Sequence, residues 1–167
     1  MVRGLAPVLL SVMLFLQSAQ ALQIGEKALD FSAPALLTPQ PIQLADHSGQ
    51  VVYLDFWASW CGPCRVSLPS LDALYHEFKT AGFSVLAVNV DADIRDAKRF
   101  LQTRPVNYPL IYDAEQRLPK LYGVKGMPTA YLIDRRGVIR HIHEGFRPGD
   151  EARLREMVRS LLAEQIQ

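Results

Sequence analysis

One stretch decides the fold of this chain: Leu54-Asp-Phe-Trp-Ala-Ser-Trp-Cys-Gly-Pro-Cys-Arg65. It continues an apolar run that starts at Val51 and is interrupted only by Asp55, and such runs are typical of a strand buried on both faces of a parallel sheet. Beyond it, apolar residues recur every three or four positions, at Leu68, Leu71, Leu74, Tyr75 and Phe78. The stretch therefore predicts a buried strand over 51–57 that leads directly into a helix from Cys64.

The rest of the chain predicts an alternation of strands and helices around this unit. Prolines and glycines over 22–50 indicate an irregular lead-in with a small hairpin that ends at the turn 46–49. Apolar patterns predict strands over 83–90, 110–112, 129–133 and 138–143, and helices over 94–101, 114–122 and 154–162. This order favours one α/β domain with helices on both faces of a central sheet.

The first residues have the pattern of an export signal. Arg3 precedes an uncharged, mostly apolar run over 5–16, which is shorter than the roughly 20 residues of a membrane-spanning helix. Small residues at Ala19 and Ala21 suit cleavage. We predict a signal peptide over 1–21 and a mature protein that begins at Leu22. The alternative is an uncut segment that anchors the protein in the membrane.

The net charge of the mature chain does not indicate a class of binding partner. The full chain has 18 Lys and Arg against 17 Asp and Glu, and removing Arg3 with the signal leaves 17 of each. A nucleic-acid-binding domain would favour a concentrated basic surface, which the clusters at 135–136 and 147–159 are too short or too mixed to supply. We expect no nucleic-acid partner, and a monomer of ordinary domain size over 22–167 that buries its own core.

Both cysteines lie in one pair, Cys61-Gly62-Pro63-Cys64. A disulfide between them closes so short a loop that it removes little chain entropy, so redox chemistry explains the pair better than stabilisation does. A helix N-terminus offers unpaired N–H groups and a positive dipole end, which favour Cys61 as a thiolate and nucleophile. Cys64, one turn into the helix, would then resolve the mixed disulfide. Pro63 suits the first helical turn, where its missing N–H costs least.

The same spacing forms half of many zinc sites, which need two further ligands. The chain has no third cysteine. His141 and His143 alternate along a predicted strand and share one face, where histidines of an exposed hairpin are more often solvated than ligating. We expect no metal and no cofactor besides the redox-active Cys61–Cys64 pair. A copper-carrying Cys-Cys-His site is the metal alternative that stays open.

The stretch 54–65, Pro69 and the run Gly126-Met-Pro-Thr129 resemble thioredoxin. The export signal, the lead-in and extra residues between Val90 and Tyr122 make the chain more similar to the exported TlpA/ResA-like thiol:disulfide oxidoreductases. The resemblance covers about residues 24–162. It implies a thioredoxin fold with a central mixed sheet, an N-terminal hairpin extension over 22–50 and a central insertion over about 91–115.

The resemblance also implies roles for residues around the cysteines. It places a cis peptide bond before Pro128, beside the pair, where backbone groups of Met127 hold a substrate peptide as an added strand. Gly62-Pro63 forms the active-site loop. Of the flanking tryptophans, we expect Trp60 to offer substrate an apolar contact and Trp57 to be structural.

Asp55 stands where thioredoxin has a buried acid. Many TlpA/ResA-like proteins instead carry a glutamate at the position of Ser67. A carboxylate buried in the central strand is costly to ionise, so its pKa should rise. Such an acid is suited to take a proton from Cys64 and return it. The alternative is an aspartate at the end of the strand that points to water.

The residues between the cysteines bear on the direction of electron flow. Gly62-Pro63 lacks the histidine of strongly oxidising relatives, so the potential should lie nearer thioredoxin at about −270 mV than DsbA at about −120 mV. We expect a periplasmic or otherwise extracytoplasmic reductase of protein disulfides, with apocytochrome c as the leading substrate and a membrane-embedded thiol shuttle as reductant. The alternatives are a disulfide oxidase, a copper chaperone, and a thiol peroxidase, which would carry a threonine at Ala58.

Overall fold

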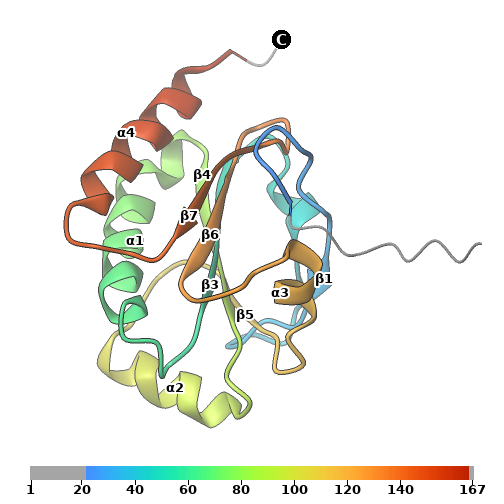
Figure 1. Ribbon diagram of the computed structural model, residues 1–167, viewed down its shortest axis with the longest axis vertical. Helices are drawn as coiled ribbons and strands as arrows, with labels where there is room; N and C mark the ends of the chain where they lie inside the picture. Colours follow the sequence, from blue (N-terminus) through green and yellow to red (C-terminus); the bar gives the residue numbers. More distant parts are fainter. Residues whose placement is uncertain (1–21, 166–167) are drawn as a thin grey trace, which may run out of the picture.

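The structure is a computed structural model that describes residues 22–165. The predicted signal peptide over 1–21 lies outside the described residues. Within them, a five-stranded mixed sheet has the strand order β5-β4-β3-β6-β7 (Figure 1). Its strands are β3 (Val51–Trp57), β4 (Phe83–Asn89), β5 (Leu110–Tyr112), β6 (Thr129–Ile133) and β7 (Ile139–Glu144). Neighbours are parallel from β5 to β3 and antiparallel from β3 to β7.

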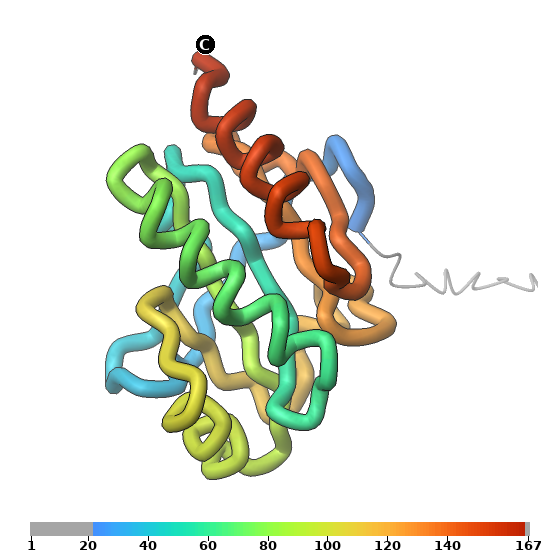
Figure 2. The backbone as a smooth tube through the Cα atoms, turned by 90° about the vertical axis from the view of Figure 1, so that its left-hand side faces the viewer, coloured from blue at the N-terminus to red at the C-terminus, as the bar shows by residue number. Residues whose placement is uncertain are grey.

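Helices cover both faces of this sheet. They are α1 (Cys64–Phe78), α2 (Ile94–Thr103), α3 (Arg117–Tyr122) and α4 (Asp150–Ala163). Figures 1 and 2 show α1 and α4 side by side on one face, with α3 and the N-terminal segment on the other. Every residue of β3 and β4 is buried, as their continuous apolar runs predict. The predicted thioredoxin-type α/β architecture is confirmed.

The N-terminal segment forms the predicted hairpin and joins both edges of the main sheet. Strands β1 (Ser32–Ala33) and β2 (Ile42–Gln43) pair antiparallel, and the 3₁₀ helix η1 (Leu44–His47) follows them. A bridge from Ala35 to Ile111 covers the β5 edge, and one from Lys27 to Val138 reaches the β6–β7 turn. The segment therefore protects sheet edges that would otherwise present unpaired backbone groups.

Helices α3 and α4 begin at other residues than the sequence predicts, and α4 begins at Asp150 rather than at residue 154. Helix α3 begins at Arg117 rather than at residue 114, because Gln116 before it takes the left-handed conformation at φ 53°. The Asp113 carboxylate accepts the first N–H groups of the helix, those of Arg117 at 3.1 Å and Leu118 at 2.7 Å. After α1, a 3₁₀ turn η2 (Lys79–Ala81) extends the helix as far as Gly82, which takes the left-handed conformation at φ 95°. The predicted insertion over 91–115 holds α2 and β5.

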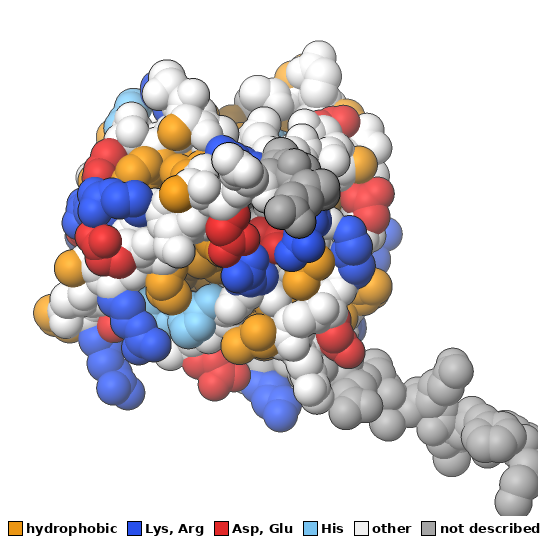
Figure 3. All heavy atoms as spheres, turned by 90° about the horizontal axis from the view of Figure 1, so that it is seen from above, with side chains coloured by type: hydrophobic (Ala, Val, Ile, Leu, Met, Phe, Trp, Pro, Cys, Tyr) orange, Lys and Arg blue, Asp and Glu red, His pale blue; other side chains and the backbone are white. Residues whose placement is uncertain are grey.

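No helix of the described residues is both long enough and apolar enough to span a bilayer. The face seen in Figure 3 carries Lys and Arg side chains interspersed with Asp and Glu. On this face, basic residues do not gather into one patch.

Candidate redox site

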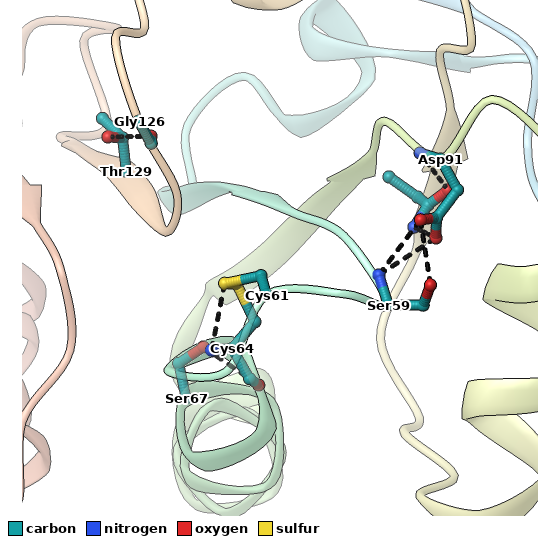
Figure 4. Close-up of a disulfide and its surroundings, with 8 residues drawn as sticks. Ser59, Cys61, Cys64, Ser67, Asp91, Gly126 and Thr129 are labelled. Carbon is teal, nitrogen blue, oxygen red and sulfur yellow. Dashed lines mark hydrogen bonds between the residues drawn. A yellow bond between two sulfur atoms is a disulfide. The ribbon is translucent and has the colours of Figure 1, made fainter.

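The two cysteines form a disulfide at the start of α1, with an S–S distance of 2.05 Å. Cys64 is the first residue of the helix and is fully buried, whereas Cys61 lies three residues earlier and is 4% exposed. The backbone N–H of Cys64 donates to Sγ of Cys61 at 3.2 Å (Figure 4). A donor directed at this sulfur stabilises the thiolate form of Cys61 after reduction.

The loop between the cysteines is shaped to start the helix. Pro63 already has helical dihedrals, φ −61° and ψ −28°, and stands just before the first helical residue. Its carbonyl accepts the N–H groups of Val66 at 3.0 Å and Ser67 at 3.1 Å. At this position the missing N–H of proline costs nothing, since the first N–H groups of a helix have no partner within it. Gly62 and Pro63 are both exposed.

Asp91 anchors the turn before the cysteines, a role that the sequence analysis missed. Its carboxylate accepts the backbone N–H of Ser59 at 3.0 Å and the Ser59 hydroxyl at 2.9 Å (Figure 4). Asn89, at the end of β4, donates its amide to the same carboxylate at 2.8 Å. The available sequence signal was the pair of polar residues where β4 ends, because parallel strands β3 and β4 end at the same edge of the sheet.

Asp55 is buried in the centre of the sheet, at 1% exposure. Its directly paired neighbours are Ala87 on β4 and Ala130 on β6, so neither paired position offers it a polar side chain. Its Oδ2 atom has no hydrogen-bond partner. Burial raises the pKa of this carboxyl from 3.8 to about 7. The expected rise in pKa is confirmed, and an aspartate that points to water is excluded.

Ser67 occupies the position where many relatives carry a glutamate. It is buried and its hydroxyl approaches the Cys64 carbonyl oxygen at 3.4 Å. It therefore brings no acid to the cysteines, and the buried acid near them in sequence is Asp55 on β3, the strand that leads into α1.

The other predicted site residues are two tryptophans and the Met127–Pro128 pair. Trp60 is 66% exposed, directly before Cys61. Trp57 is fully buried and packs against Phe100 of α2, with ring centroids 5.4 Å apart, as a structural residue would. The Met127–Pro128 peptide bond is cis, as the resemblance implied.

The loop with this cis bond lies where β3 ends. Thr129, the first residue of β6, pairs with Phe56 near the end of β3. The two segments that carry Pro128 and Cys61 therefore lie at the same end of these neighbouring strands. The Thr129 hydroxyl donates to the Gly126 carbonyl at 2.7 Å and holds the loop closed (Figure 4).

His141 and His143 share one face, as predicted, with ring centroids 6.1 Å apart. The expectation that they are solvated is wrong for His143, whose side chain is 14% exposed. Its Nδ1 lies 3.0 Å from the Tyr53 hydroxyl and its Nε2 lies 3.2 Å from Asp150. Within residues 22–165, no three His, Cys, Asp or Glu side chains are grouped to hold a metal ion.

Known proteins share this sequence and architecture. Residues 24–142 match the AhpC/TSA family. The thiol-disulfide oxidoreductase ResA of Geobacillus thermodenitrificans is 31% identical over 131 residues, which cover 78% of this chain and 75% of that protein.

Two solved structures are also similar. A Chlorobium tepidum structure, described as a thiol:disulfide interchange protein DsbE, has a TM-score of 0.82 and 45% identity, covering 86% of this chain and all of that one. A secreted thiol-disulfide isomerase of Corynebacterium glutamicum has a TM-score of 0.72 and 27% identity, covering 81% and 85% of the two chains. The chain thus belongs to the AhpC/TSA family and is a thiol-disulfide oxidoreductase of the ResA and DsbE type, with Cys61 and Cys64 as its Cys-x-x-Cys pair.

Proposed function

We propose that this protein is an extracytoplasmic reductase of protein disulfides that works by dithiol exchange. The observation that carries the proposal is the pairing of a Cys-x-x-Cys disulfide at a helix start with a buried acid, Asp55, whose pKa of about 7 lies near physiological pH. A general base is most effective when its pKa lies near the working pH.

The cycle begins when the Cys61 thiolate attacks one sulfur of a substrate disulfide. A Cys61–substrate disulfide forms, and the other substrate sulfur leaves as a thiolate. Asp55 then takes the proton of Cys64, directly or through water, and the resulting thiolate attacks Sγ of Cys61. The second substrate sulfur leaves, so two electrons have passed from the dithiol to the substrate. Both substrate thiolates take up protons from solvent.

Substrate recognition falls to the residues around Cys61. The exposed Trp60 side chain offers an apolar platform, and the backbone of Met127 before Pro128 offers the groups that bind an extended peptide as an added strand. Both segments lie at the edge of the sheet where Cys61 lies.

The direction of electron flow follows from the loop between the cysteines. Gly62-Pro63 supplies no cation that would stabilise the Cys61 thiolate against the disulfide, which favours a reducing potential. A reductase in an oxidising compartment needs an electron supply, and we assign this to a membrane-embedded thiol shuttle. The substrates are proteins with oxidised cysteine pairs, with apocytochrome c as the leading case. The protein acts as a monomer and without a bound cofactor.

Substrate trapping tests this function. A Cys64→Ser variant, expressed with its export signal, should accumulate as mixed disulfides with its substrates because nothing resolves them. Mass spectrometry of the trapped partners should identify proteins with Cys pairs, apocytochrome c among them. The Cys61→Ser, Cys64→Ser double variant is the matched control and should trap nothing. An absence of mixed disulfides in the Cys64→Ser strain would contradict the proposal.

A further inference from the structure

A hydrogen-bonded chain of three side chains runs from the buried centre of the sheet to its surface. The hydroxyl of Tyr53, on β3, lies 3.0 Å from Nδ1 of His143, on β7, and Nε2 of His143 lies 3.2 Å from Oδ2 of Asp150, at the start of α4. Exposure increases along the chain: Tyr53 is 2% exposed, and the side chains of His143 and Asp150 are 14% and 29% exposed.

The strand register places these three hydrogen-bonded side chains beside Asp55. Asp55 pairs with Ala130 of β6, and Ala130 pairs with His143, so the three residues form one row on one face of the sheet. Tyr53 lies two residues before Asp55 on the same strand and therefore on the same face. The Tyr53 hydroxyl reaches His143, so the side chain of Tyr53 leans toward the row that holds Asp55.

The hydrogen-bond donors among Tyr53, His143 and Asp150 have a defined order. The N–H of Arg147 donates to Asp150 at 2.7 Å and lowers the pKa of that carboxyl, so Asp150 is an anion that accepts from Nε2–H of His143. A neutral histidine that donates from Nε2 accepts at Nδ1. Burial raises the pKa of Tyr53, so its hydroxyl keeps its proton and donates it to Nδ1. The hydrogen-bond donors therefore point from Tyr53 in the interior toward Asp150 at the surface.

We propose that Tyr53, His143 and Asp150 form the route by which Asp55 exchanges its proton with solvent. The proposal rests on the proposed role of Asp55 as the base for Cys64. The Asp55 proton passes to the Tyr53 oxygen while the Tyr53 proton passes to Nδ1 of His143. The imidazolium then releases its Nε2 proton to water beside Asp150. The charge of Asp55 contributes, after burial, to raising the pKa of Tyr53, as expected of two groups that lie close together on one face of β3.

The neighbouring groups Tyr108 and His141 do not supply a second route for the proton. Tyr108 is buried near enough that the Asp55 charge contributes to raising its pKa, but its hydroxyl donates to the backbone carbonyl of Leu68 at 3.3 Å, which passes no proton on. His141 on β7 lies beside His143, and its pKa is lowered first by burial and then by the charges of His143 and of Arg153 on α4.

The route is tested by single-turnover kinetics on a model disulfide. In Tyr53→Phe and His143→Gln, the resolution step by Cys64 should slow about tenfold or more, within the range of lost proton transfer, while the attack by Cys61 keeps its rate. The matched control is Tyr108→Phe, which removes a hydroxyl equally buried and should resolve at the wild-type rate.

Buffer rescue separates a proton route from a structural role. In His143→Ala, added imidazole should restore the resolution rate as its concentration rises, whereas the wild-type rate should not depend on imidazole. Resolution at the wild-type rate in Tyr53→Phe and His143→Gln, beside a slow Asp55→Asn, would overturn the route and leave the role of Asp55 intact. A wild-type resolution rate in Asp55→Asn itself would overturn both.

Discussion

The carboxylate of Asp91 accepts both the backbone N–H and the hydroxyl of Ser59, at 3.0 and 2.9 Å. This contact ties the end of β4 to the turn that carries Trp60 and Cys61. The nucleophile therefore stands on a turn that a buried acid holds in place, rather than on a free loop. The exposed Trp60 follows Ser59 directly in this turn.

Removal of the Asp91 carboxylate should loosen this turn. Asp91→Ala leaves the Ser59 N–H and the buried Asn89 amide without their partner, which costs about 1–3 kcal/mol for each buried unsatisfied group. Denaturant unfolding of the oxidised protein should show this loss. The control, Ser59→Ala, removes one hydroxyl and should cost about 0.5–1.5 kcal/mol. An equal or larger loss in the control would show that Asp91 does not hold the turn.

Asp55→Asn should separate the two chemical steps of the cycle. Attack by Cys61 should keep its rate, because the proposed role of Asp55 is to take the proton of Cys64 and not to activate Cys61. Resolution should slow by about 10²- to 10⁴-fold, the range of general base catalysis. Stopped-flow measurement with a model disulfide resolves both steps. If attack and resolution slow equally, the substitution has disturbed the site rather than removed a base.

The pKa of Asp55 also predicts how stability depends on pH. The folded pKa of about 7 exceeds the ordinary 3.8, so the folded protein binds the proton more tightly. Stability is therefore highest below the unfolded pKa and falls as pH rises toward about 7. At about 1.4 kcal/mol for each pKa unit, the loss is a few kcal/mol. Denaturant unfolding at pH 5.5 and 8.5 should show the part of this loss that lies above pH 5.5, about 2 kcal/mol.

The same measurement on Asp55→Asn gives the control. This variant should be more stable than the wild type at pH 8.5 and should have a flatter dependence on pH. Asp134 and Asp150, whose pKa values are lowered, affect stability only at more acidic pH and do not obscure this range. A parallel dependence in both proteins would show that Asp55 is not the titrating group.

The export pattern at the N-terminus predicts where the protein is cut. Protein recovered from the extracytoplasmic fraction should begin at Leu22, as N-terminal sequencing would establish. An intact Met1 in the membrane fraction would instead favour the anchored alternative.

The sequence predicted those features that depend on residues close together in the chain. Continuous apolar runs located β3 and β4, and the Cys-x-x-Cys spacing located the redox pair. The burial and raised pKa of Asp55 were predicted from its place in such a run together with the resemblance to thioredoxin. The cis bond before Pro128 came only from the resemblance to thioredoxin, because X-Pro bonds in folded proteins are mostly trans.

Contacts between distant residues could not be predicted in this way. Ser59 and Asp91 are 32 positions apart, and Tyr53 and His143 are 90 apart. Neither pair has a periodic signal, because each depends on which strand ends meet. His143 was expected to be solvated, since its own hairpin is polar. The start of α4 covers it instead, and no pattern within β7 indicates that packing.

The reduction potential of the Cys61–Cys64 pair tests the central claim most directly. The purified protein is equilibrated with dithiol buffers of known potential and its thiols are then alkylated. This gives the fraction of protein with a reduced Cys61–Cys64 pair at each buffer potential. A reductase should have a potential below that of protein disulfide isomerase, about −180 mV, and near that of thioredoxin, about −270 mV. A value above about −180 mV, toward the −120 mV of DsbA, would contradict the account and identify a disulfide oxidase.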